Sequence, residues 1–171
     1  MTEEIVKEFI SESVDRINKN TLKIISCMNE LEETEVWKRP NSASNSIGNL
    51  ILHLCGNITQ YIISSLGEEE DKRERNKEFS ANGGYSKLEL IEKLNSTVEK
   101  AIAVIEHMDL KSLLRKRHVQ GFQYSGMANI IHVTEHYSYH TGQIVYWTKL
   151  LKSKDFGFYS DIDLNKKNEL S

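Results

Sequence analysis

The sequence predicts an all-α fold: a four-helix bundle in up-down-down-up order, with a long crossover between the second and third helices. The chain of 171 residues contains only 9 Gly and 1 Pro. Few breakers and few turns favour a small number of long elements. Four segments also repeat apolar residues every three or four positions, which is the spacing of amphipathic helices. This length is typical of one domain.

The helix boundaries follow from capping residues and breakers. Pro40 stops the first helix and opens a polar loop. Ser46, Ser86 and Ser125 are expected N-caps, because their hydroxyl oxygens can accept hydrogen bonds from free backbone N–H groups. Ser86 and Glu89 have the spacing of a capping box. The predicted helices cover residues 2–33, 47–66, 86–109 and 125–152.

The connections decide the order of the helices. About 19 residues join the second and third helices, more than a simple hairpin needs. Such a loop can span the length of a helix, which is about 30 Å for 20 residues, and so cross the bundle from end to end. We interpret its charged run, residues 68–77, as a solvated stretch or a short helix. Residues 115–124 are expected to form an irregular loop or a short hairpin, and the domain is expected to cover residues 1–159. A polar, loose tail is expected at 160–171.

Charge and cysteine content exclude several classes of protein. The net charge of −3 is not typical of a protein that binds nucleic acid or an anionic membrane. The sequence contains no apolar run long enough for a membrane span and no signal-peptide pattern at its N-terminus. Cys27 and Cys55 lie far apart in the sequence, and we interpret them as free thiols in a reducing, cytoplasmic environment. Cysteine-cluster zinc sites and disulfide scaffolds are therefore excluded.

Histidine spacing points to metal chemistry. Of 6 histidines, His132, His136 and His140 lie four residues apart on the last predicted helix. Residues four apart stack on one helix face, so two imidazoles can close on one ion. His107 and His118 are interpreted as ordinary surface residues.

The second predicted helix carries a matching polar stripe, formed by Asn49, His53 and Asn57 among apolar neighbours. Buried polar groups need partners. One hypothesis is a buried hydrogen-bond network or a wet interface. The sharper hypothesis is that His53 faces His136 and His140 and completes a three-histidine site. Asn49, Asn57 and Gln143 would then support the ligands or face the substrate.

His132 allows a competing interpretation. Residues 132–136 read His-x-x-Glu-His, which is the inverted zinc-peptidase motif, with His132 and His136 as ligands and Glu135 as general base. That class also needs a downstream carboxylate ligand. The only downstream Glu, Glu169, lies in the expected tail, and the motif leaves His53 and His140 without a role. We therefore place His132 at the rim of the site.

Two segments resemble the DinB/YfiT-like superfamily. The first is residues 45–57, Asn-Ser-Ile-Gly-Asn-Leu-Ile-Leu-His-Leu-Cys-Gly-Asn, and the second is residues 136–144, His-Tyr-Ser-Tyr-His-Thr-Gly-Gln-Ile. The resemblance extends over nearly the whole chain, and the sequence looks closest to an uncharacterised branch. It implies an up-down-down-up bundle that holds a divalent metal through His53, His136 and His140. Some relatives transfer low-molecular-weight thiols such as bacillithiol, mycothiol or glutathione to electrophiles.

Three neutral imidazoles leave an ion its full charge and at least one open position, as in catalytic zinc sites. We therefore expect a metal-dependent enzyme that binds zinc or nickel and uses a low-molecular-weight thiol as co-substrate on a small-molecule electrophile. The alternatives are a hydrolase using a metal-bound water and a non-catalytic metal- or ligand-binding bundle. The catalytic residues remain unassigned, and a homodimer is the expected assembly.

Overall fold

The computed structural model describes residues 1–168 and is mostly helical, as the sequence predicts. Its elements in chain order are α1 (Thr2–Glu30), α2 (Glu33–Val36), α3 (Ile47–Ile58), the π-helix η1 (Thr59–Ser64), α4 (Arg75–Ser80), α5 (Lys87–Glu106), α6 (Leu110–Leu114), β1 (Lys116–Val119), β2 (Phe122–Ser125) and α7 (Gly126–Lys152).

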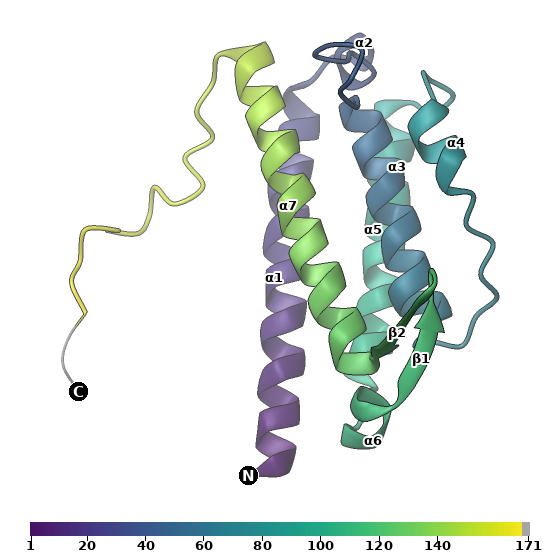
Figure 1. Cartoon of the computed structure of the whole chain (residues 1–171). Coiled ribbons are helices and arrows are strands. Elements are labelled where there is room, and N and C mark those ends of the chain that lie inside the picture. The colour runs from purple at the N-terminus through teal and green to yellow at the C-terminus, as the bar shows by residue number, and fades with distance from the viewer. Residues whose placement is uncertain (169–171) are drawn as a thin grey trace.

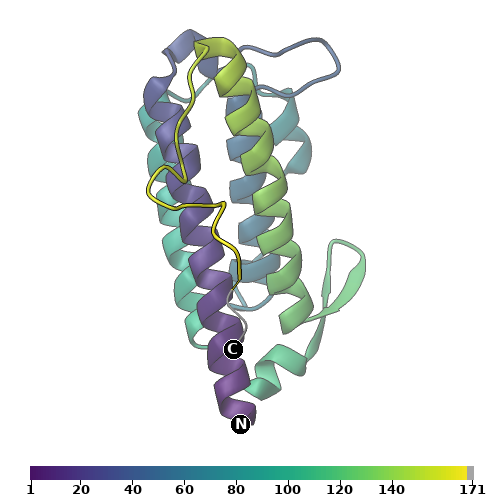
Figure 2. The ribbon, with the colours of Figure 1, turned by 90° about the vertical axis from the view of Figure 1, so that its left-hand side faces the viewer.

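The long helices α1, α3, α5 and α7 lie side by side (Figures 1 and 2). α1 packs against α5 and α7, and α3 packs against the same two helices. In Figure 1, α1 and α7 run upward, whereas α3 and α5 run downward. The connection between α3 and α5 climbs the side of the molecule next to α3 and carries α4 near its upper end.

α3 is the most deeply buried helix. Eleven of its 12 residues are buried, and only Gly56 is partly exposed. The helix is surrounded by α5, α7 and α4, which explains why its sequence is apolar on almost every side. The polar side chains of Asn49, His53 and Asn57 are therefore enclosed and depend on protein partners.

The predicted caps are all present. Ser46, Ser86 and Ser125 accept hydrogen bonds from the backbone N–H groups three residues further on. The capping box of Ser86 and Glu89 is complete. The second predicted helix differs from the expectation because its last turns widen into η1.

The hairpin of β1 and β2 settles the nature of residues 115–124 and adds a small sheet to the expected all-α fold. The two strands are antiparallel, with Val119 paired to Phe122. Gln120 and Gly121 between them have φ values of 50° and 82°. Two successive residues with positive φ form the type I′ turn, whose twist suits a two-residue hairpin.

Beyond α7 the chain turns back, and its later part runs out to the side of the bundle, away from α1 (Figure 1). Phe156 and Phe158 pack partly against the core, and the Lys23 ammonium donates to the Tyr159 hydroxyl over 2.9 Å. Residues 160–168 are exposed. The expected loose tail stays a prediction, and its residues 169–171 lie outside the described part of the chain.

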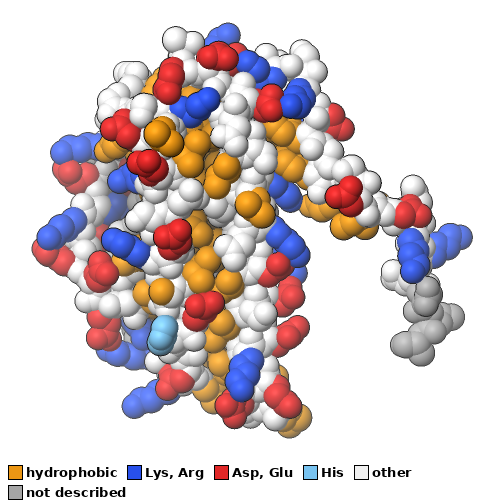
Figure 3. All heavy atoms as spheres, turned by 180° about the vertical axis from the view of Figure 1, so that it is seen from behind, with side chains coloured by type: hydrophobic (Ala, Val, Ile, Leu, Met, Phe, Trp, Pro, Cys, Tyr) orange, Lys and Arg blue, Asp and Glu red, His pale blue; other side chains and the backbone are white. Residues whose placement is uncertain are grey.

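Acidic and basic side chains are interspersed over the face seen in Figure 3, with apolar side chains between them. Over residues 1–168, no helix has both the length and the apolar character that crossing a bilayer requires.

Candidate metal centre

His53 on α3 meets His136 and His140 on α7 where the two helices face each other. One ring nitrogen from each histidine lies within 4.8 Å of the others. His53 and His140 are 5% and 9% exposed, and His136 is half-buried. The three histidines singled out by the sequence are therefore brought together, from positions up to 87 residues apart in the chain.

The three rings are arranged edge-on around a common point. The centroid of the His53 ring lies 5.0 Å from that of His136 and 5.1 Å from that of His140. The angles between the ring planes are 73° for the first pair and 86° for the second. His136 and His140 are 4.5 Å apart, with their planes at 86°. Crossed rings let the nitrogen lone pairs converge, which stacked rings would prevent.

The surroundings keep His136 and His140 neutral. Burial, followed by the positive charges that His140 and His53 would carry, lowers the pKa of His136 to about 3. Burial also lowers the pKa of His140, although its hydrogen bond with Gln143 opposes the shift. An imidazole must be neutral to bind a metal ion, so both groups are available as ligands at neutral pH.

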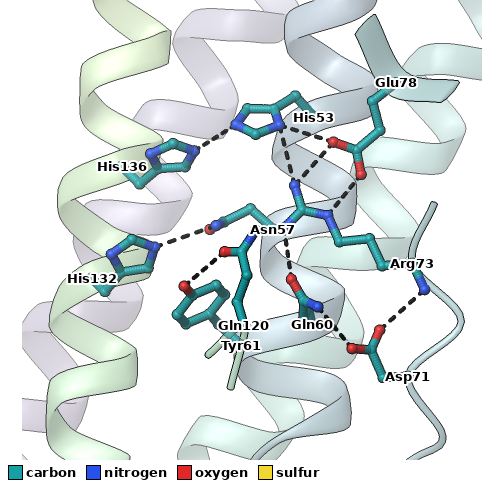
Figure 4. A network of polar contacts seen from close by, with 10 residues as sticks. All are labelled: His53, Asn57, Gln60, Tyr61, Asp71, Arg73, Glu78, Gln120, His132 and His136. Carbon is teal, nitrogen blue, oxygen red and sulfur yellow. Dashed lines mark hydrogen bonds and ion pairs between the residues drawn. The ribbon is translucent and has the colours of Figure 1, made fainter. Parts of the chain in front are cut away.

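The edge of the His53 ring that carries Nδ1 contacts a carboxylate from the crossover between α3 and α5 (Figure 4). Glu78 Oε2 on α4 lies 2.9 Å from His53 Nδ1. The same carboxylate accepts two hydrogen bonds from the guanidinium of Arg73, from Nε to Oε1 over 2.7 Å and from NH2 to Oε2 over 2.9 Å. The side chains of Arg73 and Glu78 are only 3% and 10% exposed.

Further hydrogen bonds fix Arg73 to η1 and within the crossover. Arg73 also donates to Gln60 Oε1 over 2.9 Å, and its backbone N–H donates to Asp71. Burial raises the pKa of Glu78, but the hydrogen bonds from Arg73 and His53 outweigh it and leave that pKa below its usual value. The group is therefore a carboxylate and can only accept.

The predicted polar neighbours have distinct partners. Asn49 donates to the backbone carbonyls of Glu78 and Ala81, so it binds α4 rather than the centre. Gln143 Oε1 lies 2.7 Å from His140 Nδ1 and accepts a hydrogen bond from it, which leaves the other ring nitrogen of His140 for the centre.

Asn57 lies one turn beyond His53 on α3. Its amide nitrogen is 3.3 Å from His132 Nε2 (Figure 4). The ring of His132 stacks on that of His136, with centroids 5.5 Å apart and planes at 13°. Among the described residues, Asn57 Oδ1 is buried without a hydrogen-bond partner. His132 thus lies beside the centre and outside the group of three.

The inverted-peptidase interpretation has no support from this geometry. Glu135 is exposed and lines a groove between α1 and α7, together with Phe9 and Glu12. A base in that position does not face the three histidines. His107 and His118 are exposed, in line with their assignment as surface residues.

Sequence reasoning missed Arg73 and Glu78. Most residues of the run 68–77 are exposed, as expected, but the Arg73 side chain is buried. One signal could have been used: Gly56 lies inside a helix, where glycine costs about 1 kcal/mol relative to alanine. A Cβ at that position would collide with the Glu78 carboxylate.

The donor set fits a divalent transition ion. Zinc and nickel accept imidazole ligands, and two of the three rings here are fixed through their second ring nitrogen by Glu78 and Gln143. Among residues 1–168 the cluster contains these three histidines and no fourth protein ligand.

Comparisons with known proteins agree with the fold. Residues 4–163 match the family described as "Protein of unknown function (DUF1572)". No curated protein matches the sequence.

Three solved structures have similar folds. A conserved protein from Enterococcus faecalis has a TM-score of 0.72 at 14% identity, over 84% of this chain and 97% of that one. A DinB-like protein from Bacillus subtilis has a TM-score of 0.67 at 16% identity, over 86% and 96%. A DinB-like protein from Bacillus cereus has a TM-score of 0.62 at 13% identity, over 78% and 87%.

Proposed function

The chain belongs to the DUF1572 family, and on this premise we propose that it is a metal-dependent enzyme from an uncharacterised branch of the DinB/YfiT-like superfamily, a proposal that its DinB-like fold supports. His53, His136 and His140 hold one divalent ion, zinc or nickel. The fold is the up-down-down-up bundle of the superfamily, with the crossover between α3 and α5. The reaction is the transfer of a low-molecular-weight thiol to a small electrophile.

One observation carries this proposal: three imidazole nitrogens converge within 4.8 Å, and no fourth protein ligand joins them among the described residues. Structural zinc sites use four protein ligands, whereas catalytic sites use three and leave a position for substrate or water. The three-ligand set therefore supports an enzyme over a purely structural metal site.

A bound divalent ion would supply Lewis acidity, which favours thiolate over thiol at neutral pH. The residues of the chain prepare the site for that chemistry. Gln143 and Glu78 orient two of the rings. Two aromatic rings flank the histidines: the Phe79 ring centroid lies 4.6 Å from that of His53, and the Tyr139 ring centroid lies 5.0 Å from that of His140.

These two aromatic rings support a small substrate with an apolar part, because aromatic faces bind such groups and exclude water. Nucleic acid is not the proposed partner, because the chain has a net charge of −3. The proposed location is the cytoplasm, where a thiol co-substrate stays reduced. The proposed assembly is a homodimer.

Elemental analysis of protein purified without added metal tests the first step. We expect one zinc or nickel ion per chain, and we expect the His136→Ala variant to lose it. The same preparations are then assayed with a panel of low-molecular-weight thiols and a chromogenic electrophile. Metal bound without any thiol transfer, combined with hydrolysis of activated esters, would favour the hydrolase alternative. Metal bound with neither activity would favour a non-catalytic binding protein.

A further inference from the structure

Glu78 occupies an unusual position for an acidic side chain. Of the acidic residues in the range 1–168, it is the only buried one. It belongs to the crossover between α3 and α5 and directly follows residues 68–77, the charged run interpreted from the sequence as a solvated stretch or a short helix. Its carboxylate nevertheless reaches His53 Nδ1 over 2.9 Å. A buried carboxylate is costly unless it is paired and hydrogen-bonded, so its surroundings must compensate for its charge.

Three features of the structure hold the carboxylate in this place. Arg73 binds both of its oxygens. Asn49 fixes the C-terminal end of α4, because its side-chain amide donates to the backbone carbonyls of Glu78 and Ala81. Gly56 leaves the space on α3 that the carboxylate and the guanidinium fill, since a Cβ there would overlap Glu78 and approach Arg73 Nε to 2.9 Å.

The contacts of His53 allow two tautomers with opposite consequences. Arg73 Nη2 lies 3.2 Å from His53 Nδ1, and a guanidinium can only donate hydrogen bonds. If Nδ1 accepted from Arg73, the ring proton would sit on Nε2, and His53 could not bind a metal through that nitrogen. If Nδ1 donates to Glu78, Nε2 keeps its lone pair and points it at His136, 2.9 Å away.

We propose that Glu78 is the positioning residue of the centre: it holds the His53 proton on Nδ1, and Arg73 fixes the carboxylate that does so. The carboxylate is the better partner for Nδ1 because a charged acceptor strengthens the hydrogen bond. The Arg73 NH2 group already donates to Glu78 Oε2. The crossover thereby prepares a ligand on α3 before any ion is bound.

The charges support the same assignment. Arg73 and Glu78 neutralise each other, so the pair orients His53 without adding net charge beside the centre. The inference rests on the proposed metal-binding function, which it deepens by identifying what controls the ligand. Partners that orient a ligating histidine raise metal affinity, and their loss weakens it about 10–100-fold.

The first test needs no metal. Long-range proton–nitrogen NMR spectra of the metal-free, histidine-labelled protein report which ring nitrogen carries the proton. The His53 signal is assigned by its loss in His53→Gln. We expect a protonated Nδ1 in the natural sequence, and a mixed or Nε2-protonated ring in Glu78→Gln. A natural protein with the proton on Nε2 would overturn the proposal.

The second test measures zinc affinity by competition with a chromogenic chelator. We expect Glu78→Gln to bind zinc about 10–100-fold more weakly. Glu74→Gln is the matched control, because Glu74 lies on the same segment and pairs with Lys77 at the surface. It is expected to bind zinc like the natural protein.

A third variant separates positioning from folding. Removing one partner of a buried ion pair can prevent folding, whereas replacing both with apolar residues of similar size is often tolerated. The double variant Arg73→Met with Glu78→Met should therefore stay helical and melt cooperatively, yet bind zinc as weakly as Glu78→Gln.

Zinc binding within twofold of the natural protein in both Glu78 variants would overturn the positioning role. A natural protein that binds no zinc would instead refute the proposed function, and the tautomer of His53 would still decide the role of Glu78.

Discussion

His53 Nε2 and His136 Nε2 lie 2.9 Å apart, although 83 positions separate the two residues in the sequence. A contact of this length between two neutral imidazoles needs a proton on one nitrogen and a lone pair on the other. Because His53 Nδ1 donates to Glu78, the shared proton belongs to His136 in the metal-free protein. His136 therefore has to move its proton to Nδ1 before it can serve as a ligand.

This requirement gives the first prediction. Adding one equivalent of zinc should convert His136 from the Nε2-protonated to the Nδ1-protonated tautomer, while His53 keeps its proton on Nδ1. The proton–nitrogen NMR spectra of the free and zinc-bound protein follow both rings at once. An unchanged His136 ring in the zinc-bound protein would show that it is not a ligand through Nε2.

The second prediction distinguishes the three proposed ligands from His132, which lies beside them. His136→Ala should lose most of the bound metal, because it removes one of three ligands. His132→Ala should keep it, because His132 contacts Asn57 and stacks on His136 without joining the cluster. Metal content per chain, measured by elemental analysis, checks both variants. Equal losses would restore the inverted-peptidase hypothesis, with Glu135 as the base to examine.

The sequence was sufficient for the parts of the molecule that depend on local pattern. Apolar spacing located the long helices, and Ser46, Ser86 and Ser125 marked where three of them begin. The histidines could be singled out because an isolated polar stripe in α3 and a four-residue repeat in α7 are anomalies within single helices. Their convergence follows once the two helices pack together.

Arg73 and Glu78 could not be found in the same way. They lie in a run of alternating charges, and no local pattern distinguishes the buried pair from exposed neighbours such as Glu74 and Lys77. Their burial depends on how the crossover docks on α3, which is a tertiary property. The widening of the helix into η1 is another such property.

The third prediction concerns the space beside α3. Gly56→Ala should displace the Glu78 carboxylate, and so bind zinc about tenfold more weakly, because the new methyl group would overlap it. Gly142→Ala is the matched control, since Gly142 lies on α7 with open space around its Cβ position. That control should keep its zinc affinity and gain about 0.5–1 kcal/mol of stability. Chelator competition and urea unfolding measure the two quantities, and equal zinc affinities would contradict the role assigned to Gly56.

The fourth prediction concerns metal removal. The core of α1, α3, α5 and α7 is apolar and extensive, so the protein should fold without metal. A chelator at neutral pH should leave the helical circular dichroism almost intact and lower the melting temperature. Bound metal adds about 2.7 kcal/mol of stability when the free ion is at 100 times its dissociation constant. Collapse of the helical signal on chelation would make the site structural.

The fifth prediction is a pH dependence of the metal-free protein. The pKa values of His132, His136 and His140 are lowered in the folded state, that of His136 from 6.5 to about 3. Below about pH 6.5 the unfolded chain takes up protons that the folded chain resists, so acid favours unfolding. The contribution of these histidines to the free energy of unfolding should be complete above about pH 6.5, and it should decrease as the pH drops towards 3.

Urea unfolding at a series of pH values measures this loss. His136→Asn provides the comparison, because it removes the most strongly shifted group and should flatten the dependence between pH 6.5 and 4. A stability profile of the same slope in both proteins would show that His136 is not held neutral by its surroundings.

The separation of the ligands along the chain also bears on biosynthesis. While the protein is being made, α3 and the crossover with Glu78 leave the ribosome well before α7, which carries His136 and His140. A nascent chain that ends before α7 contains a single ligand of the three and cannot retain an ion through this set. If the chain holds the proposed ion, its loading has to follow the docking of α7, and the ion is not a template on which the earlier helices assemble.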